Sequence, residues 1–242
     1  QNFTLHTGNG ADTVVFGVAD SGSSADILKT TTGSITIDLG SSDTGSKADN
    51  FTLHGNMVAE TAVTLTSGDG ADVLTVNGEI TSNTDAIDII TGSDSDQFTV
   101  KGLIKAQTNV TLDTADGSDI VTLGELVGGI AQGGIETVAG TVKLDLGEMT
   151  EGASDNDQFT LIGDITSNVE IDFDSGAGAD VVTVNGTMTT TTGAIDINTG
   201  SESDQIDILG RLEAGTSFKM HTGSGEDDLE LTGAVNSSRT ST

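Results

Sequence analysis

The sequence predicts an all-β protein that folds as a parallel β-solenoid, also called a β-helix, of about nine rungs of 23–24 residues, two of them enlarged. The first observation is an aspartate that recurs at a fixed place in a hydrophobic pattern, most often every 23 or 24 residues. The second is that the residues two and four positions after each of these aspartates are apolar in every copy. Self-similarity at such a period is typical of repeat architectures. These nine anchor aspartates are Asp12, Asp49, Asp72, Asp96, Asp119, Asp157, Asp180, Asp204 and Asp227.

Each repeat is expected to contain one strand before the anchor, one after it, and a short third strand. Apolar residues stand nine and seven positions before the anchor, two and four positions after it, and again eight positions after it. Alternation with a period of two indicates a strand with one buried face. A Ser or Thr, followed by small residues and glycines, marks the turn that leads into the anchor. In one repeat these positions are Val63, Leu65, Ser67, Asp72, Leu74, Val76 and Ile80.

A single rung of this size is not stable alone. Burial of five inward side chains contributes roughly 8–15 kcal/mol. Ordering the residues of the rung costs more than this, at about 1–2 kcal/mol for each residue. Stacking of equivalent positions at ~4.8 Å between rungs must therefore supply the difference.

A longer period of four rungs lies over the shorter one. Residues 70–78 read GADVLTVNG, and residues 178–186 read GADVVTVNG. We expect residues 1–242 to form one continuous solenoid with super-repeats at about 41–148 and 149–242, and with 1–40 as the end of a preceding copy. The two enlarged rungs fall at about 13–49 and 120–157. Their extra residues, placed at 17–31 and 126–140, are expected to form a bulge or an added strand on one edge.

The composition excludes several classes of function. The net charge is -30, with 38 acidic residues against eight basic ones. Nucleic acid and anionic membrane surfaces are poor partners for such a chain, because both require basic patches. The absence of cysteine excludes disulfides and thiolate metal sites. The short apolar runs argue against membrane insertion. The chain opens directly on a strand-like segment, so we expect either that a secretion signal has been removed or that the chain is a piece of a longer protein.

The column of anchor aspartates predicts a cation site. Carboxylates stacked ~4.8 Å apart repel one another by about 1 kcal/mol per neighbour in water. Calcium would relieve this repulsion, because it binds six to eight carboxylate and carbonyl oxygens. Two alternatives stay open: hydrogen bonds from the amides of the anchor's own turn, or simple screening by counterions. The candidate ligands are the nine anchors together with Asp69, Asp94, Asp116 and Glu202, and further acids beside the column are Asp113 and Asp174.

Four of the turns have the pattern Gly-x-Gly-x-Asp, at residues 8–12, 68–72, 176–180 and 223–227. This pattern resembles half of the calcium-binding nonapeptide of the repeats-in-toxin (RTX) family, and the resemblance implies calcium held between turns of adjacent rungs. Two rungs depart from it, because Asp94 and Glu202 replace the second glycine, and the rungs are longer than those of the nonapeptide. The whole chain is also similar to the β-strand-repeat regions of large secreted or surface-attached bacterial proteins, which implies an extracellular location.

The function expected from these features is structural: a secreted or cell-surface protein of a fibre, sheath or surface layer, stabilised by calcium. Its expected partner is itself, through end-to-end or lateral stacking into a homopolymer. The alternative is a stalk or ligand-binding segment of a calcium-dependent adhesin, for which surface glycans are candidate partners. A polysaccharide-active β-helix enzyme is the third possibility. We expect no enzyme, because the carboxylates follow the repeat rather than break it, and the chain has no Trp or Tyr.

Overall fold

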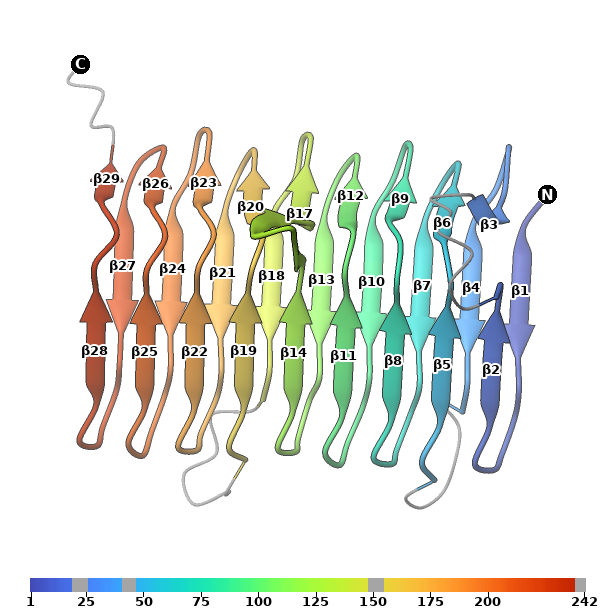
Figure 1. Ribbon diagram of the computed structural model, residues 1–242, viewed down its shortest axis with the longest axis horizontal. Coiled ribbons are helices and arrows are strands. Elements are labelled where there is room, and N and C mark those ends of the chain that lie inside the picture. Colours follow the sequence, from blue (N-terminus) through green and yellow to red (C-terminus); the bar gives the residue numbers. More distant parts are fainter. Residues whose placement is uncertain (19–25, 41–46, 148–154, 238–242) are drawn as a thin grey trace.

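The computed structural model describes residues 1–18, 26–40, 47–147 and 155–237. These residues form a parallel β-solenoid of nine rungs (Figure 1), as the sequence predicts. Each rung passes in turn through three sheets, here called sheet A, sheet B and sheet C, and each sheet has nine parallel strands. The described residues contain no helix.

The strand bounds follow the predicted period of the repeat. Sheet A contains β1 (Phe3–His6), β4 (Ile35–Asp38), β7 (Val63–Thr66), β10 (Ile87–Ile90), β13 (Val110–Asp113), β18 (Val142–Asp145), β21 (Ile171–Asp174), β24 (Ile195–Asn198) and β27 (Phe218–His221). Sheet B contains β2 (Thr13–Phe16), β5 (Asn50–Leu53), β8 (Val73–Val76), β11 (Gln97–Val100), β14 (Ile120–Leu123), β19 (Gln158–Leu161), β22 (Val181–Val184), β25 (Gln205–Ile208) and β28 (Asp228–Leu231). Sheet C contains β3 (Asp26–Lys29), β6 (Asn56–Ala59), β9 (Ile80–Ser82), β12 (Leu103–Ala106), β17 (Gly134–Thr137), β20 (Asp164–Ser167), β23 (Met188–Thr190), β26 (Leu212–Ala214) and β29 (Val235–Ser237).

Equivalent residues of successive rungs lie directly over one another. In sheet B, Leu74 pairs with Phe51 on one side and with Phe98 on the other. All three side chains are fully buried. The rings of Phe159 in sheet B and Phe173 in sheet A approach to 4.8 Å between centroids. The core is therefore a set of continuous apolar columns that runs through the interior between the three sheets.

Buried hydroxyl groups close the corner at which the chain leaves sheet C for sheet A. The Thr137 hydroxyl donates to the Gly140 carbonyl at 3.0 Å, and the Thr190 hydroxyl donates to the Gly193 carbonyl at 2.8 Å. These bonds span three residues, so they hold the chain in a tight turn, and they add a second donor to carbonyls that already accept a backbone N–H from the next rung.

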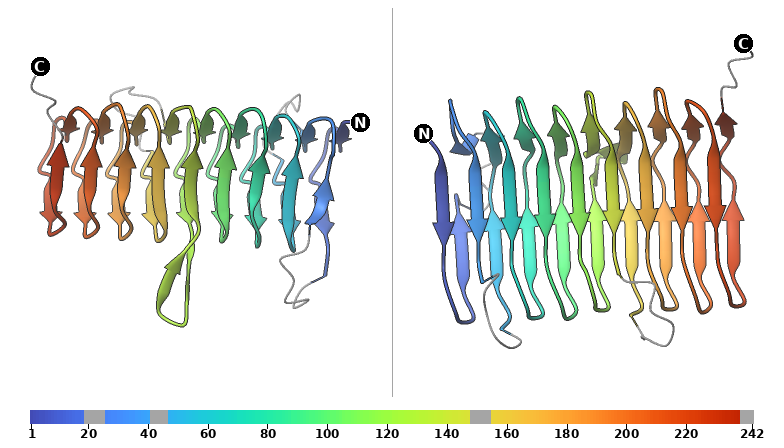
Figure 2. Two further views of the ribbon diagram at one scale, coloured as in Figure 1. Left: turned by 90° about the horizontal axis from the view of Figure 1, so that it is seen from above. Right: turned by 180° about the vertical axis from the view of Figure 1, so that it is seen from behind.

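The second enlarged rung contains an antiparallel hairpin, β15 (Glu125–Val127) and β16 (Ile130–Gln132). Gly128 and Gly129 connect its strands with φ values of +59° and +83°. Positive φ at both central residues is typical of a type I′ turn, which suits the twist of a two-residue hairpin. The hairpin projects from the body of the solenoid (Figure 2).

The placement of the extra residues at 126–140 was only partly right. The hairpin occupies the first part of this range, but Gly134–Thr137 is a regular strand of sheet C. Residues 148–154, in the same enlarged rung, lie outside the described residues. In the first enlarged rung, the predicted extra segment 17–31 lies in part outside them, because residues 19–25 are not described. Where the chain is described again, β3 pairs with β6 through an irregular register, as at a β-bulge.

We predict that the hairpin contributes little to the stability of the solenoid. Ile130 is 68% exposed, whereas Ile135, on the adjoining strand of sheet C, is 1% exposed. The substitution Ile130→Ala should change the free energy of unfolding by no more than about 0.5 kcal/mol. The matched substitution Ile135→Ala should lower it by about 2–5 kcal/mol, because it opens a cavity in the core. Urea unfolding followed by circular dichroism measures both, and equal losses would contradict the assignment of the hairpin as an appendage.

Candidate functional site

The anchor aspartates lie at the turn between sheet A and sheet B, immediately before each strand of sheet B. In rungs two to eight the anchors are buried, with exposures of 3% or less. Asp12 and Asp227, in the two end rungs, are half-buried. The repeat therefore places seven carboxyl groups in one column inside the protein, at a position where a surface turn would be expected to keep them in water.

Hydrogen bonds join the anchors into a ladder along the solenoid. The Oδ1 atom of each anchor from Asp49 to Asp227 accepts a hydrogen bond from the backbone N–H of the anchor in the preceding rung. The N···O distances range from 2.6 Å, between Asp12 and Asp49, to 3.2 Å, between Asp204 and Asp227. The donor is thus the amide of the neighbouring rung, and not an amide of the anchor's own turn as in the hydrogen-bonded alternative.

The second carboxyl oxygen has a different environment. The Oδ2 atom of Asp180 accepts a hydrogen bond from the Ser175 hydroxyl at 2.6 Å. Among the described residues, six other anchors have a buried Oδ2 atom without a hydrogen-bond partner: Asp12, Asp72, Asp96, Asp119, Asp157 and Asp204. A buried carboxylate oxygen without a donor is costly, so the ladder requires a proton or a cation to neutralise it.

Burial raises the pKa of the carboxyl groups in this column. It raises the pKa to about 6 for Asp72, to about 8 for Asp96 and to about 9 for Asp157, from a reference value of 3.8. Neighbouring anchors act in the same direction, because each carboxylate disfavours a second charge beside it. The Thr91 hydroxyl lies beside the Asp96 carboxyl and lowers its pKa. The Thr91 hydroxyl and the Oδ2 atom of Asp96 nevertheless form no hydrogen bond with good geometry.

A protonated anchor can accept the backbone N–H of the preceding rung and carry no buried charge. Its Oδ1 atom continues to accept the backbone N–H of the preceding rung, while the proton on Oδ2 removes the buried charge and supplies a donor. At neutral pH the two anchors with the highest pKa values, Asp96 and Asp157, then favour the neutral form.

The glycine positions of the turn follow from the close approach of successive rungs. A Cβ atom on Gly178 would lie 1.9 Å from the carbonyl oxygen of Asp155, in the rung before, and would clash with it. Where acids replace this glycine, the backbone takes another conformation: Asp94 and Glu202 have φ values of +78° and +74°, in the left-handed region. The departures from the Gly-x-Gly pattern are thus accommodated by a change in the turn.

The other predicted ligands lie apart from the anchors. Asp69, Asp94, Asp116 and Glu202 are exposed on the outside of the turns. Within the residues that the structure describes, no three His, Asp or Glu side chains come together as a group that could hold a metal ion. Each anchor from Asp49 to Asp227 has one oxygen engaged by a backbone N–H, so it offers only one further oxygen to an ion. Calcium binding by the anchors stays a prediction.

A second acidic column, on the outer face of sheet A, was only partly expected. Asp113, Asp145 and Asp174 pair in register on three successive rungs. Burial raises the pKa of Asp174, and the carboxyl of Asp145 adds to this increase. The Lys143 ammonium pairs with Asp145 at 2.6 Å. The sequence had indicated Asp113 and Asp174, but the enlarged rung between them interrupts the spacing by which Asp145 would have been found.

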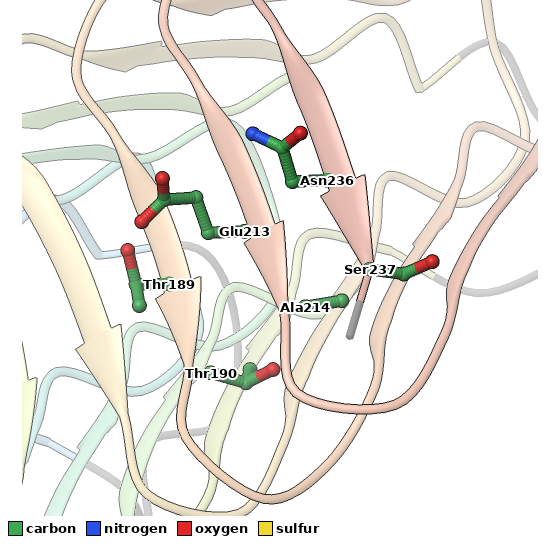
Figure 3. A pocket seen from close by; sticks show the side chains of 6 residues that line it. All are labelled: Thr189, Thr190, Glu213, Ala214, Asn236 and Ser237. Atoms are coloured by element: carbon green, nitrogen blue, oxygen red, sulfur yellow. The ribbon is translucent and has the colours of Figure 1, made fainter. Parts of the chain in front are cut away.

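A shallow hollow of about 420 Å³ lies on sheet C near the last rung (Figure 3). Among the described residues that line it, Glu213 is the only one with a titratable side chain, and it forms an ion pair with Arg211. The hollow therefore lacks the pair of carboxyl groups that most glycoside hydrolases use. Its lining consists of Thr189, Thr190, Glu213, Ala214, Asn236 and Ser237.

Comparison of the chain with protein-family models, with curated proteins and with solved structures finds no match. The described part of the chain also has no helix of the length and apolar character needed to cross a membrane.

We predict that the ladder makes the protein less stable as the pH rises. Because the folded pKa of Asp96 is about 8 and the reference value is 3.8, the folded state binds more protons than the unfolded state between these values. The free energy of unfolding contributed by Asp96 should therefore fall as the pH rises through this window. Asp96→Asn keeps the Oδ1 acceptor and removes the charge, so it should raise the melting temperature at pH 8 and leave it nearly unchanged at pH 4.

The control for this prediction is Asp94→Asn, because Asp94 is exposed in the same turn. Thermal melts of both variants and of the parent chain between pH 4 and pH 9 measure the effect. A loss of stability at pH 8 that is confined to Asp96→Asn would contradict the ladder of neutral acids, and it would favour a bound cation that needs the carboxylate.

Proposed function

We propose that this protein is a structural component of an extracellular fibre, sheath or surface layer, in which solenoids stack end to end. The observation that carries the proposal is the pair of open end rungs. Within the described residues, sheets A, B and C each end in strands that have one neighbouring strand: β1, β2 and β3 at one end, and β27, β28 and β29 at the other. Unpaired strand edges are templates for the addition of further strands.

The apolar residues of the end rungs support this proposal. Leu229 is 44% exposed and Leu231 is 41% exposed, although the equivalent residues of inner rungs are buried. At the opposite end, Val14 and Phe16 are half-buried and pack against the core from one side only. If the register of the solenoid continues across a junction between two copies, Leu229 and Leu231 meet Val14 and Phe16. The junction then repeats the packing found between any two rungs.

Divalent cations would favour assembly because they lower the charge of the chain. Two copies, each with a net charge of -30, repel one another, and this repulsion opposes assembly. The exposed turn acids Asp69, Asp94, Asp116 and Glu202 are the candidate cation ligands, because they are open to solvent on the outside of the turns. Calcium bound there would lower the charge at this edge.

A stalk or binding segment of an adhesin is the second candidate. The hairpin β15–β16 supports it, because Leu126, Val127 and Ile130 are 65%, 46% and 68% exposed on an element that projects from the body. Exposed apolar side chains at one place on a polar surface are typical of binding sites. Catalysis is not part of either proposal.

We predict that charge placed on the open C-terminal rung will block end-to-end assembly. The double substitution Leu229→Glu and Leu231→Glu should abolish polymers that the parent chain forms, because it would bury two carboxylates at each junction. Glu230→Gln, on the same strand but exposed on the outer face, is the matched control and should assemble like the parent. Negative-stain electron microscopy and sedimentation velocity measure the length of the assemblies. A parent chain that stays monomeric in millimolar calcium at high concentration would overturn the proposed function.

We also predict that calcium promotes assembly through the turn acids. Removal of calcium with a chelator should shorten the polymers of the parent chain and lower its melting temperature. Asp94→Asn combined with Asp116→Asn should weaken the response to calcium, whereas Asp207→Asn, outside the turns, should not. An identical response to calcium and to an equal ionic strength of sodium chloride would show that screening alone acts.

A further inference from the structure

The outer face of sheet B carries no charge over seven rungs. The outward residues of β2, β5, β8, β11, β14, β19 and β22 form two columns, one position and three positions after the anchors. None of these outward positions, all within the described residues, is Asp, Glu, Lys or Arg. The strands of this sheet occupy the lower half of Figure 1.

The composition of the two columns is regular. One column contains threonine in six successive rungs, and the other alternates between an amide side chain and a β-branched side chain. After Val15 of the first rung, the threonine column is Thr52, Thr75, Thr99, Thr122, Thr160 and Thr183. After Thr13 of the first rung, the second column is Asn50, Val73, Gln97, Ile120, Gln158 and Val181.

The other two sheets differ from sheet B. On sheet A the corresponding outward positions include Asp88, Asp145 and Asp172. On sheet C they include Lys105 and Glu136, which form an ion pair at 2.6 Å. In a chain with 38 acidic residues, the neutral face of sheet B is therefore a property of one surface and not of the chain as a whole.

We propose that the outer face of sheet B is a lateral pairing surface for a second copy of this chain. The argument is electrostatic. Two copies repel at nearly every relative orientation, and the repulsion is smallest when their neutral faces meet. The threonine, valine and isoleucine side chains of two such sheets can then pack face to face, with about 10 Å between the sheets.

The charges at the borders limit the pairing geometry. Asp207, Asp228 and Glu230 stand on the outer face of the last two rungs, so the neutral surface ends after the seventh rung. An antiparallel pair that is centred on the fourth rung, at Thr99, keeps these three acids outside the contact. The acids of the turns, such as Asp69 and Asp94, lie at the rim, where solvent screens them.

The area of the face indicates a weak contact for one pair of chains. Seven rungs ~4.8 Å apart and two columns ~7 Å apart cover roughly 500 Å² on each copy. Stable complexes bury about 800 Å² on each partner. Pairing therefore becomes strong only when the neutral faces of many end-to-end copies act together, so the proposal deepens the proposed assembly and rests on it.

The experiment separates lateral pairing from end-to-end stacking. The end-blocked chain, with Leu229→Glu and Leu231→Glu, is examined by sedimentation equilibrium up to millimolar concentration. We expect a monomer–dimer equilibrium that is strengthened by sodium chloride, because salt screens the repulsion of the charged surfaces. Thr99→Glu with Thr122→Glu in this background should weaken dimerisation by at least about tenfold. The matched control, Thr64→Glu with Thr111→Glu, places the same charges on the outer face of sheet A and should leave dimerisation nearly unchanged.

A cysteine cross-link supplies a second measurement, because the chain contains no cysteine of its own. Thr99→Cys should be linked into a dimer by a bismaleimide reagent with a short spacer, because the paired sheets lie too far apart for a direct disulfide, and Thr111→Cys on sheet A should not be linked. An end-blocked chain that remains monomeric at all concentrations, or equal cross-linking of both variants, would overturn lateral pairing. Binding of the monomer to cellulose powder, lost in Thr99→Glu with Thr122→Glu, would also overturn it and would assign the face to a neutral polysaccharide. A parent chain that forms no polymers, together with a dimer of the end-blocked chain, would instead contradict only the end-to-end assembly.

Discussion

Every feature of this protein depends on the hydrogen-bonded register between successive rungs. Backbone bonds hold each residue over its equivalent in the next rung, as Leu74 is held between Phe51 and Phe98. A shift of one residue would turn every inward side chain of a strand outward. The register therefore makes the core, and it also brings together identical polar groups that would otherwise avoid one another.

The anchor ladder is the direct result of this constraint. Stacking places the carboxyl groups of Asp72, Asp96 and Asp119 in one buried column. The ladder uses one oxygen of each group to satisfy the backbone N–H of the previous rung, at 2.8 Å for both bonds among these three residues. The second oxygen is buried without a hydrogen-bond partner in most of the anchors, and burial raises the pKa of these carboxyl groups, which favours their neutral form. The same aspartate thus joins two rungs and is the reason why the stability of the fold is predicted to depend on pH.

The register also separates the surface into faces of different character. Because outward positions stack as strictly as inward ones, each sheet exposes columns of related side chains. Sheet A exposes Asp113 over Asp145 over Asp174, whereas sheet B exposes threonine over threonine. The hairpin β15–β16 interrupts neither sheet, because it leaves the body between β14 and β17 and forms its own pairs. A solenoid can thus carry charged, neutral and projecting surfaces on one frame.

The sequence by itself determined the repeat, the three-strand rung and the identity of the core, because the apolar residues recur at positions that only stacking can bury together. It also located the anchors. Only the tertiary structure decided what the anchors do, because the donor to Asp96 is the amide of Asp72, 24 residues away, and local turn chemistry does not reveal it. The limits of the hairpin and the place of Asp145 in its column likewise depended on the structure, since insertions in the enlarged rung displace residues from the period. Burial of like charges and the neutrality of sheet B are properties of stacked columns, and these columns exist only after the chain has coiled.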